Sequence, residues 1–501
     1  MTAVPKSVVD GGNAHSARRI DHEGGSRAAF HAPFICRPQN LSVMHRISRL
    51  VAALVAAILI AQPAMAQSIL RDAETEALFR EMSSPMITAA GLNPKSVDIV
   101  MIGDPSINAF VAGGQVVYIH SGLIEAAANA NEVQGVIAHE LGHVAAGDVI
   151  RSSAGASEAT GITILSLLLG AAAIAAGSGD AGAGILMAGQ QAAMGKYLAF
   201  SRSVEAGADE SARRYLSKSG ISGKGMISFF KKLQQEEFRY SQDKIDPYAV
   251  THPLSGDRIA VLKDRMAVDA AWQTPTDPAI EARFQRVKAK LFGYINEPND
   301  TLNRYPLSDS SIPAHYARAY AFHKQAFVDK AVAETDALLA AKPGDPYFEE
   351  LKGQILLESG RPSDALAVLR DAVQRTNYDP LIAALFGHAL IATEDKAHFA
   401  EAKTVLRNAV QRDRENPFAW YQLGVIYTQE GDQARAALAS AEKYDLEGQA
   451  PLALRNANVA MAGLPKGTPD WLRAQDISLV AKTQVDAQHR KGGRRKRLAG
   501  R

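Results

Sequence analysis

The chain has 501 residues and a single cysteine, Cys36, which lies near the N-terminus. A fold held together by disulfides, or a metal site built from several thiolates, is therefore excluded. Lys and Arg (55) nearly balance Asp and Glu (53), for a formal net charge of +2, so nothing indicates nucleic acid as the main partner.

Residues 1–66 are predicted to be a leader. A basic segment begins at Met44, an apolar run follows from Leu50 to Ala61, and Ala-Met-Ala at 64–66 offers a cleavage site. This order is typical of a secretory signal peptide over 44–66, cleaved after Ala66, and it suggests that translation begins at Met44. The alternative is a membrane anchor, but a run of about 12 residues is short against the roughly 20 that a span needs.

Loss of the leader changes the composition. Seven Lys/Arg and three Asp/Glu lie within residues 1–66, so the formal charge of the remaining chain becomes about −2. Seven more Lys/Arg lie in Arg490–Arg501, which leaves the folded part mildly acidic. The only cysteine is also lost, so any metal must be held by His, Asp or Glu.

A strand is predicted over Val111–His120, because β-branched and aromatic residues follow Gly113-Gly114. Such a strand could border a cleft and bind an extended polypeptide through its edge. The alternative is a sheet strand with no substrate contact.

The most informative motif is His-Glu-Leu-Gly-His at 139–143, on a predicted helix over Glu132–Ala146. Residues four apart lie on one helix face, so His139 and His143 can direct two imidazoles at one point, within reach of Glu140. Two nitrogen ligands and a general base are what a zinc hydrolase requires. The alternative is a coincidence on a surface helix.

Residues 162–200 form an apolar insertion. Ile162–Ala176 and Ile185–Phe200 are two apolar arms around a glycine-rich turn at Gly177–Gly184. Three interpretations remain open: a helical hairpin over the cleft or at a membrane surface, a buried pair of core helices, and a true membrane hairpin. The many Ala and Gly residues favour close helix packing.

The best candidate for a third metal ligand follows this insertion. A second helix is predicted to open at Ser201 and run to about Ser217, with Glu205 and Asp209 on one face. Glu205 could ligate the metal, and Asp209 could accept the free N–H of a ligating histidine. The alternative is an ordinary exposed acidic turn.

The C-terminal part repeats with a period of about 34 residues. An amphipathic helix near 280–291 and a polar linker over 296–312 precede it. Prolines recur at 346, 380, 417 and 451, with glycines at 353, 387 and 424 at a constant offset. This pattern predicts tetratricopeptide repeats over 313–480, whose concave face binds proteins. The basic tail 481–501 is predicted to be disordered, with anionic lipid as one conceivable contact.

Together these motifs resemble the HtpX-like gluzincin peptidases, and most closely the periplasmic members with a tetratricopeptide tail. The resemblance covers most of the chain after the leader and rests on further matching segments: Leu70–Glu74, Ala90–Leu92, Asn108–Phe110, Gly113-Gly114, Ser121–Leu123, Thr251–Leu254 with Arg258-Ile259, and Trp471–Asp476. The chain departs from the usual pattern at Asp148, where members often have His, and at Gly207, where they often have an acid.

The resemblance implies an α+β, mostly helical fold: a gluzincin-type zinc protease domain over 67–295, then the all-α repeat array. It implies one Zn²⁺ per chain, bound by His139, His143 and Glu205. Glu140 would take a proton from the zinc-bound water and pass it to the leaving amine. His252 and Arg258 are candidates to stabilise the oxyanion. His252 could instead occupy the open zinc position until substrate displaces it, and Arg258 could form only a salt bridge.

The sequence is consistent with two functions. The first is a periplasmic zinc endopeptidase acting on unfolded or misassembled outer-membrane proteins, whose repeats recruit clients or the β-barrel assembly machinery. The second is a chaperone or scaffold for the same process with a latent zinc site. The presence of Glu140 favours the enzyme, because a pure scaffold needs no base.

Overall fold

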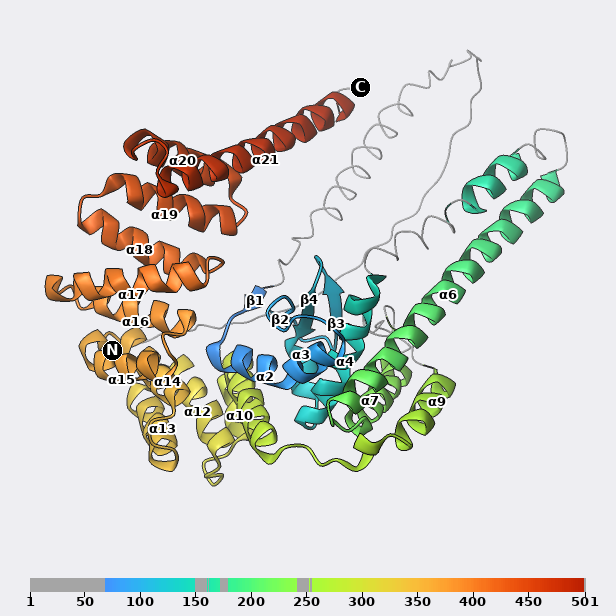
Figure 1. Cartoon of the computed structure of the whole chain (residues 1–501), viewed down its shortest axis with the longest axis horizontal. Coiled ribbons are helices and arrows are strands. Elements are labelled where there is room, and N and C mark those ends of the chain that lie inside the picture. Colours follow the sequence, from blue (N-terminus) through green and yellow to red (C-terminus); the bar gives the residue numbers. More distant parts are fainter. Residues whose placement is uncertain are drawn as a thin grey trace, which may run out of the picture. The chain divides into compact units, whose positions relative to one another are not determined.

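The computed structural model describes residues 68–148, 160, 162–171, 179–240, 252 and 255–499 (Figure 1). The predicted leader, 1–66, therefore lies outside the described residues. The first domain contains a four-stranded sheet in the order β1-β2-β4-β3. The outer pairs, β1/β2 and β3/β4, are antiparallel and the central pair β2/β4 is parallel. The strands are β1 (Ser68–Leu70), β2 (Asp98–Gly103), β3 (Ala109–Ala112) and β4 (Val116–His120).

The predicted strand over Val111–His120 is two strands in the structure. Gly113 and Gly114, with φ of +63° and +104°, make the turn between β3 and β4. A left-handed conformation at two successive positions is easily reached by glycine, so the Gly-Gly pair reverses the chain and does not lead into one strand. Consequently β4 is paired on both edges, and β3 is one of the two terminal strands of the sheet, with β1 at the other end.

Helices cover this sheet and form the domain core. They are α2 (Ala73–Ala89), α3 (Ser121–Ala126), α4 (Ala130–Ala146), α6 (Gly179–Lys218), α7 (Lys224–Tyr240), α9 (Gly256–Ala267), the 3₁₀ turn η1 (Ala270–Gln273) and α10 (Pro278–Ile295). Helix α4 is buried on every side from Ala130 to His143. Two glycines let its neighbours approach closely: a Cβ on Gly135 would clash with the backbone of Met226 in α7, and one on Gly142 with Ala208 in α6.

The helix that carries Glu205 does not open at Ser201, as the sequence suggested. It begins at Gly179, so the predicted turn is helical over 179–184 and the second apolar arm continues into the ligand helix. Alanine and other strong helix formers between the glycines explain this, since isolated glycines cost only about 1 kcal/mol each. Residues 162–171 of the first arm are helical as well.

The repeat array consists of antiparallel helix pairs, as predicted. Its helices are α12 (Ile312–Lys324), α13 (Val328–Ala341), α14 (Pro346–Glu358), α15 (Pro362–Arg375), α16 (Pro380–Ala392), α17 (Phe399–Arg412), α18 (Pro417–Gln429), α19 (Gln433–Leu446), α20 (Ala450–Gly463) and α21 (Pro469–Ala499). The periodic prolines stand in the first turns of α14, α16, α18 and α20, where the missing N–H has no cost. The periodic glycines mark close crossings: a Cβ on Gly353 would meet Leu369, and one on Gly387 would meet Leu406.

Two segments predicted to be irregular are helical. The linker 296–312 contains α11 (Pro298–Arg304), which begins with a proline in its first turn and packs beside α12. The tail is not disordered, because α21 continues to Ala499. Its first half packs on α19 and α20, and Lys and Arg are good helix formers that let the helix extend from that support. The 3₁₀ turn η2 (Lys396–His398) holds the three extra residues of the 37-residue repeat.

Helix α10 joins the two domains through a buried ion cluster. Its Arg286 binds Glu74 of α2 and lies 2.7 Å from Oδ2 of Asp345, which caps α14. Lys290, one turn on, binds Asp72, the N-cap of α2. A cavity of about 240 Å³ opens beside Lys290, between β1 and the first repeats. The first domain is therefore fixed to the repeats by buried ion pairs.

Glu350 of α14 lines this cavity, and its Oε2 is buried with no hydrogen-bond partner among the described residues. Burial, helped by the nearby carboxylates of Asp72 and Asp379 against the opposing charge of Lys290, raises the pKa of Glu350 to about 8. An unfolded glutamate ionises near pH 4.3, so the folded state holds an extra proton between these values and loses relative stability as the pH rises.

We therefore expect Glu350→Gln to raise the melting temperature by about 2–4 °C at pH 8 and to leave it unchanged near pH 4. Thermal unfolding of both proteins at the two pH values measures this. A shift of equal size at both pH values would mean that packing, and not ionisation, distinguishes the variant.

Candidate metal centre

The local sequence explains how α4 presents its chemistry. Asn129 caps the helix by accepting from the backbone N–H of Glu132, and the Glu132 side chain accepts from the backbone N–H of Ala128. Gly147, in the left-handed conformation with φ of +67°, ends the helix. Between these ends His139 and His143 lie on one buried face, as their spacing predicts.

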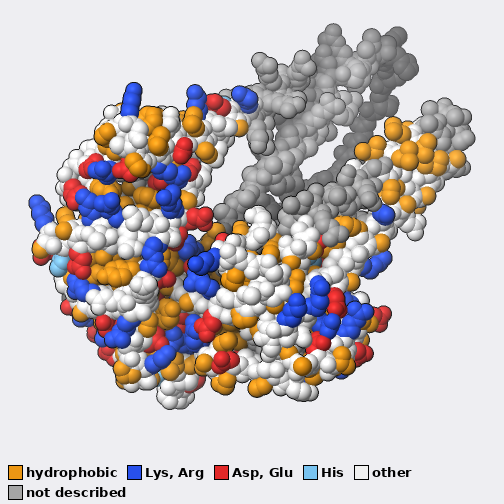
Figure 2. All heavy atoms as spheres, in the orientation of Figure 1, with side chains coloured by type: hydrophobic (Ala, Val, Ile, Leu, Met, Phe, Trp, Pro, Cys, Tyr) orange, Lys and Arg blue, Asp and Glu red, His pale blue; other side chains and the backbone are white. Residues whose placement is uncertain are grey.

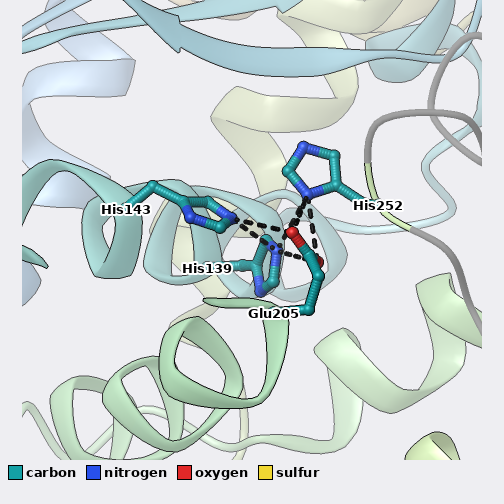
Figure 3. A group of neighbouring side chains, drawn as sticks. All are labelled: His139, His143, Glu205 and His252. Carbon is teal, nitrogen blue, oxygen red and sulfur yellow. Dashed lines mark hydrogen bonds and ion pairs between the residues drawn. The ribbon is translucent and has the colours of Figure 1, made fainter. Parts of the chain in front are cut away.

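Four side chains that can ligate a metal meet at one point: His139 and His143 from α4, Glu205 from α6, and His252 (Figure 3). All four are buried. The two α4 imidazoles approach each other through their Nε2 atoms, 3.2 Å apart. Nδ1 of His252 lies 3.3 Å from Nε2 of His139 and 3.0 Å from Oε1 of Glu205. The carboxylate of Glu205 lies 3.4 Å from His139 and 3.5 Å from His143.

These separations fit a tetrahedral metal. Ligand atoms about 2.0–2.1 Å from zinc in tetrahedral geometry stand roughly 3.3 Å from one another. Five of the six distances between ligand side chains, 3.0 to 3.5 Å, lie around this value, and all four ligand atoms lie within 4.8 Å of one another. Nitrogen and carboxylate donors without thiolate suit zinc. The residues present therefore fit the implied ion, and His252 is a fourth side chain of the same cluster.

The ligands are held by a second layer of carboxylates. Nδ1 of His139 lies 3.1 Å from Oδ1 of Asp209, as expected for the partner that fixes a ligand's tautomer. Arg258 in turn donates two hydrogen bonds to Asp209, and its Nη2 lies 3.1 Å from Glu205. Of the two roles left open for Arg258, the salt bridge is the one that this geometry favours, because the guanidinium faces carboxylates.

The partner of His143 was not predicted from the sequence. Nδ1 of His143 lies 3.0 Å from Oδ2 of Asp148, and both side chains are buried. Asp148 was noted only as a departure from the family pattern. Its position directly after the helix-ending Gly147 could have identified it, because a left-handed residue turns the chain back over the last helical turn.

The charges within the site depend on each other. Burial opposes the charged form of His139, but its contacts with Asp209 and Glu205 outweigh this and raise the pKa of His139 to about 10. Burial would raise the pKa of Glu205, yet His139 and His252 hold it well below its usual range. The carboxylates of Glu205 and Asp209 therefore favour a positive charge beside them, and a metal cation would supply one.

Glu140 is fully buried, and neither of its carboxylate oxygens has a hydrogen-bond partner among the described residues. The Nε2 atom of His252 lies 3.7 Å from Oε1 of Glu140. Buried polar atoms are rarely left without a partner, and such exceptions are typical of functional groups that await a ligand or water. Glu140 therefore stands beside the ligand cluster with its oxygens available to a reactant.

Comparisons with known proteins agree with this site. Residues 70–266 match the model of Peptidase family M48, and this range contains all four cluster residues. These residues form an M48 metallopeptidase domain. The motif Thr251–Leu254 contains His252, and its other three residues lie outside the described part of the chain.

Similarity to proteins with both domains extends beyond the M48 domain. The chain is 25% identical to the β-barrel assembly-enhancing protease (BepA) of Escherichia coli K12 over 74% of this chain and 75% of that protein. The Yersinia pestis protein of the same name is 24% identical, with 74% and 76% covered. Metalloprotease LoiP of E. coli K12 is 32% identical over 36% of this chain and 66% of that protein. Among solved structures, the tetratricopeptide protein YrrB covers 36% of this chain and 92% of its own, at 21% identity and a TM-score of 0.28.

The predicted resemblance and fold class are thus confirmed: an M48 metallopeptidase domain is followed by helical repeats. The chain is a metallopeptidase with a His-His-Glu-His cluster.

Proposed function

We propose that the chain is a zinc-dependent endopeptidase that cleaves unfolded or misassembled outer-membrane proteins in the periplasm. The observation that carries the proposal is the buried Glu140 beside a ligand cluster of tetrahedral dimensions. The similarity to β-barrel assembly-enhancing proteases over three quarters of both chains supports the client class. Export is supported by the signal-like sequence at 44–66.

Each site residue then has a role. His139, His143 and Glu205 would hold Zn²⁺, which lowers the pKa of a water and polarises the scissile carbonyl when it is bound. Glu140 accepts the proton of the attacking water and donates it to the leaving amine. Asp209 and Asp148 hold the two α4 imidazoles in orientation, and Arg258 fixes Asp209.

The terminal strand β3 is the proposed guide for substrate. The sequence suggested that substrate binds at the edge of a strand over 111–120. Because β4 is paired on both sides, only β3 of this segment has a free edge for binding. An extended polypeptide could add to β3 through backbone hydrogen bonds, so recognition would depend on extended shape more than on sequence. Unfolded proteins supply such segments and folded barrels do not.

We further propose that His252 keeps the site latent by holding the fourth position. Replacing His252 with Ala should raise cleavage of an unfolded protein about tenfold, which corresponds to removing a competing ligand worth about 1.4 kcal/mol. Initial rates, with the zinc content of each sample determined in parallel, measure the effect. His388→Ala, a half-buried histidine of the repeats, is the matched control. Equal or lower activity at full zinc content would contradict latency.

The test of the client class uses one protein in two states. The chain, loaded with zinc, is incubated with an outer-membrane β-barrel protein either unfolded or folded in detergent. We expect cleavage of the unfolded state alone. The alternative function is a chaperone or scaffold with a latent zinc site, which the position of His252 favours. Suppressed aggregation of the barrel protein, with zinc bound and no cleavage even by the His252→Ala variant, would support this alternative and reject the peptidase.

The repeats and the envelope location are part of the same proposal. The repeats would recruit clients or the β-barrel assembly machinery, because arrays of this kind bind proteins and perform no chemistry. Pull-down of assembly-machinery subunits by the whole chain, compared with a chain substituted on the concave repeat face, tests this role.

A further inference from the structure

The two apolar arms contact each other through small residues. A Cβ placed on Gly189 of α6 would lie 1.7 Å from Oγ of Ser166, so only glycine permits this crossing. Ser166 and Gly170 of the first arm are buried, as is Ala193, one turn after Gly189. The Ser166 hydroxyl donates within its own helix, to the carbonyl of Ile162 at 2.7 Å. The small and polar side chains of this hairpin therefore face inward.

The large apolar side chains face outward. Those at least two-fifths exposed are Ile164, Leu165, Leu167, Leu168, Leu169, Met187, Met194 and Leu198. In Figure 2 hydrophobic side chains cover the end of α6 away from the rest of the domain. On the first arm the five exposed side chains spread over about 200° of the helix circumference, and the buried Ser166 and Gly170 lie in the remaining arc, since successive residues are about 100° apart. Asp180 is the only charged residue between Ile162 and Gly195.

This arrangement is the reverse of that in a water-soluble hairpin. In water, large apolar residues gather between helices and polar ones face outward. In a bilayer the surroundings are as apolar as leucine, so helices instead meet through Gly, Ala and Ser, and hydroxyls bond to their own backbone. Helix contacts made by small residues and an apolar surface on every outer side are thus two independent indications of lipid.

We propose that the hairpin formed by residues 162–171 and 179–200 inserts its distal part into one leaflet of a membrane. Within the described residues no helix is long and apolar enough to cross a bilayer. Gln190 and Gln191, both exposed, suit the level of the head groups. The stretch from Gly179 to Gly189 is then about 16 Å long, close to the ~15 Å half-thickness of the hydrocarbon. Insertion would hold the M48 domain at the membrane surface.

A second copy of the chain or another protein is a poorer occupant. A protein partner covers one stripe of a helix, and the remaining outward leucines would stay in water. Burying one leucine side chain contributes about 1.5–3 kcal/mol, so lipid, which covers every outer side of the inserted part, gains the most. Leu168 and Met187, at 65% and 73% exposure, lie among the outward residues of the inserted part.

The test is flotation of residues 67–501, which form one compact unit, with vesicles of phosphatidylethanolamine and phosphatidylglycerol. We expect binding that persists in high salt, and a drop in the partition coefficient of about tenfold or more for the Leu167→Gln, Leu168→Gln double variant. The matched control is Val268→Gln, Leu307→Gln, which changes two exposed apolar residues elsewhere and should bind as the wild type does. Helical content and zinc binding show that each variant is folded.

Tryptophan quenching distinguishes the inserted part of the hairpin from the part that stays outside the lipid. Tryptophan at Leu168, which lies just to the inserted side of the Ser166–Gly189 crossing, should be quenched by lipids brominated in the upper acyl chain, and tryptophan at Leu198 should not. Three outcomes would overturn the proposal: equal binding by the double variant, binding that vanishes in high salt as expected of the basic tail alone, or self-association in solution that the double variant abolishes without any vesicle binding. Cleavage of a soluble unfolded substrate does not depend on insertion, so the peptidase proposal can stand or fall separately.

Discussion

Glu140→Gln should abolish peptide hydrolysis while leaving the metal in place. The glutamine has the same shape as the buried glutamate, and no hydrogen bond to a described residue is lost, because neither oxygen of Glu140 has a partner there. The substitution removes only the ability to accept a proton, since an amide cannot take one from the attacking water. General bases contribute about 10²–10⁴ to rate, so the cleavage rate should fall at least about a hundredfold.

The measurement is the initial rate of cleavage of an unfolded protein, with zinc per chain determined on the same samples. Glu132→Gln on the same helix is a control for structural damage, because Glu132 binds Lys232, Ser228 and the helix start but lies away from the ligands. It should lower stability and spare the chemistry. Retained activity in Glu140→Gln at full zinc content would remove Glu140 from the reaction, and loss of zinc would make it a structural residue.

The sequence could predict those parts of the site that depend on helix periodicity. His139, Glu140 and His143 are placed by spacing within one helix, and Glu205 and Asp209 by the same rule within another. Asp148 escaped because its contact with His143 depends on the left-handed turn at Gly147, which periodicity does not describe. The direction of Arg258 escaped for a similar reason, since only the tertiary fold brings α9 beside Asp209.

The fold was predictable to a similar extent. The repeats were located from proline and glycine spacing because each repeat packs mainly on its neighbours, so local signals suffice. The turn at Gly113-Gly114 was placed inside one strand, since β-branched residues on both sides suit a single strand or a hairpin equally well. The helices over 298–304 and 481–499 were missed because polar composition alone suggested irregular chain. The first packs beside α12, and the second continues a helix whose first half packs on α19 and α20.

The junction of the two domains could not be foreseen, because its charges come from segments far apart in the chain. Glu74, Arg286 and Asp345 meet with less than a tenth of each side chain exposed. Arg286 also lies over the ring of Phe348, 4.7 Å from its centre. Arg286 holds the pKa of the buried Asp345 carboxyl below its usual range. The same carboxyl caps α14.

Arg286→Ala should therefore destabilise the chain by about 3–5 kcal/mol, because it removes the closest positive charge from two buried carboxylates, Glu74 and Asp345. The lost stability should weaken mainly the contact between the first domain and the repeats. Trp272 reports on the M48 domain and Trp420 and Trp471 on the repeats, so urea unfolding followed in variants that keep one reporter can separate the two. We expect one joint transition in the wild type and two in the variant.

The control is Arg283→Ala, one turn earlier on α10, whose partner Glu81 is half exposed. A surface pair of this kind contributes roughly 0–1 kcal/mol, so its loss should leave a single transition near that of the wild type. Adding Asp345→Asn to Arg286→Ala should cost less than the sum of the separate effects, because the second change removes one of the stranded charges. Strict additivity would mean that the two residues do not share a network, and the repeats would then owe their position to apolar contacts such as Ala73 against the repeat core.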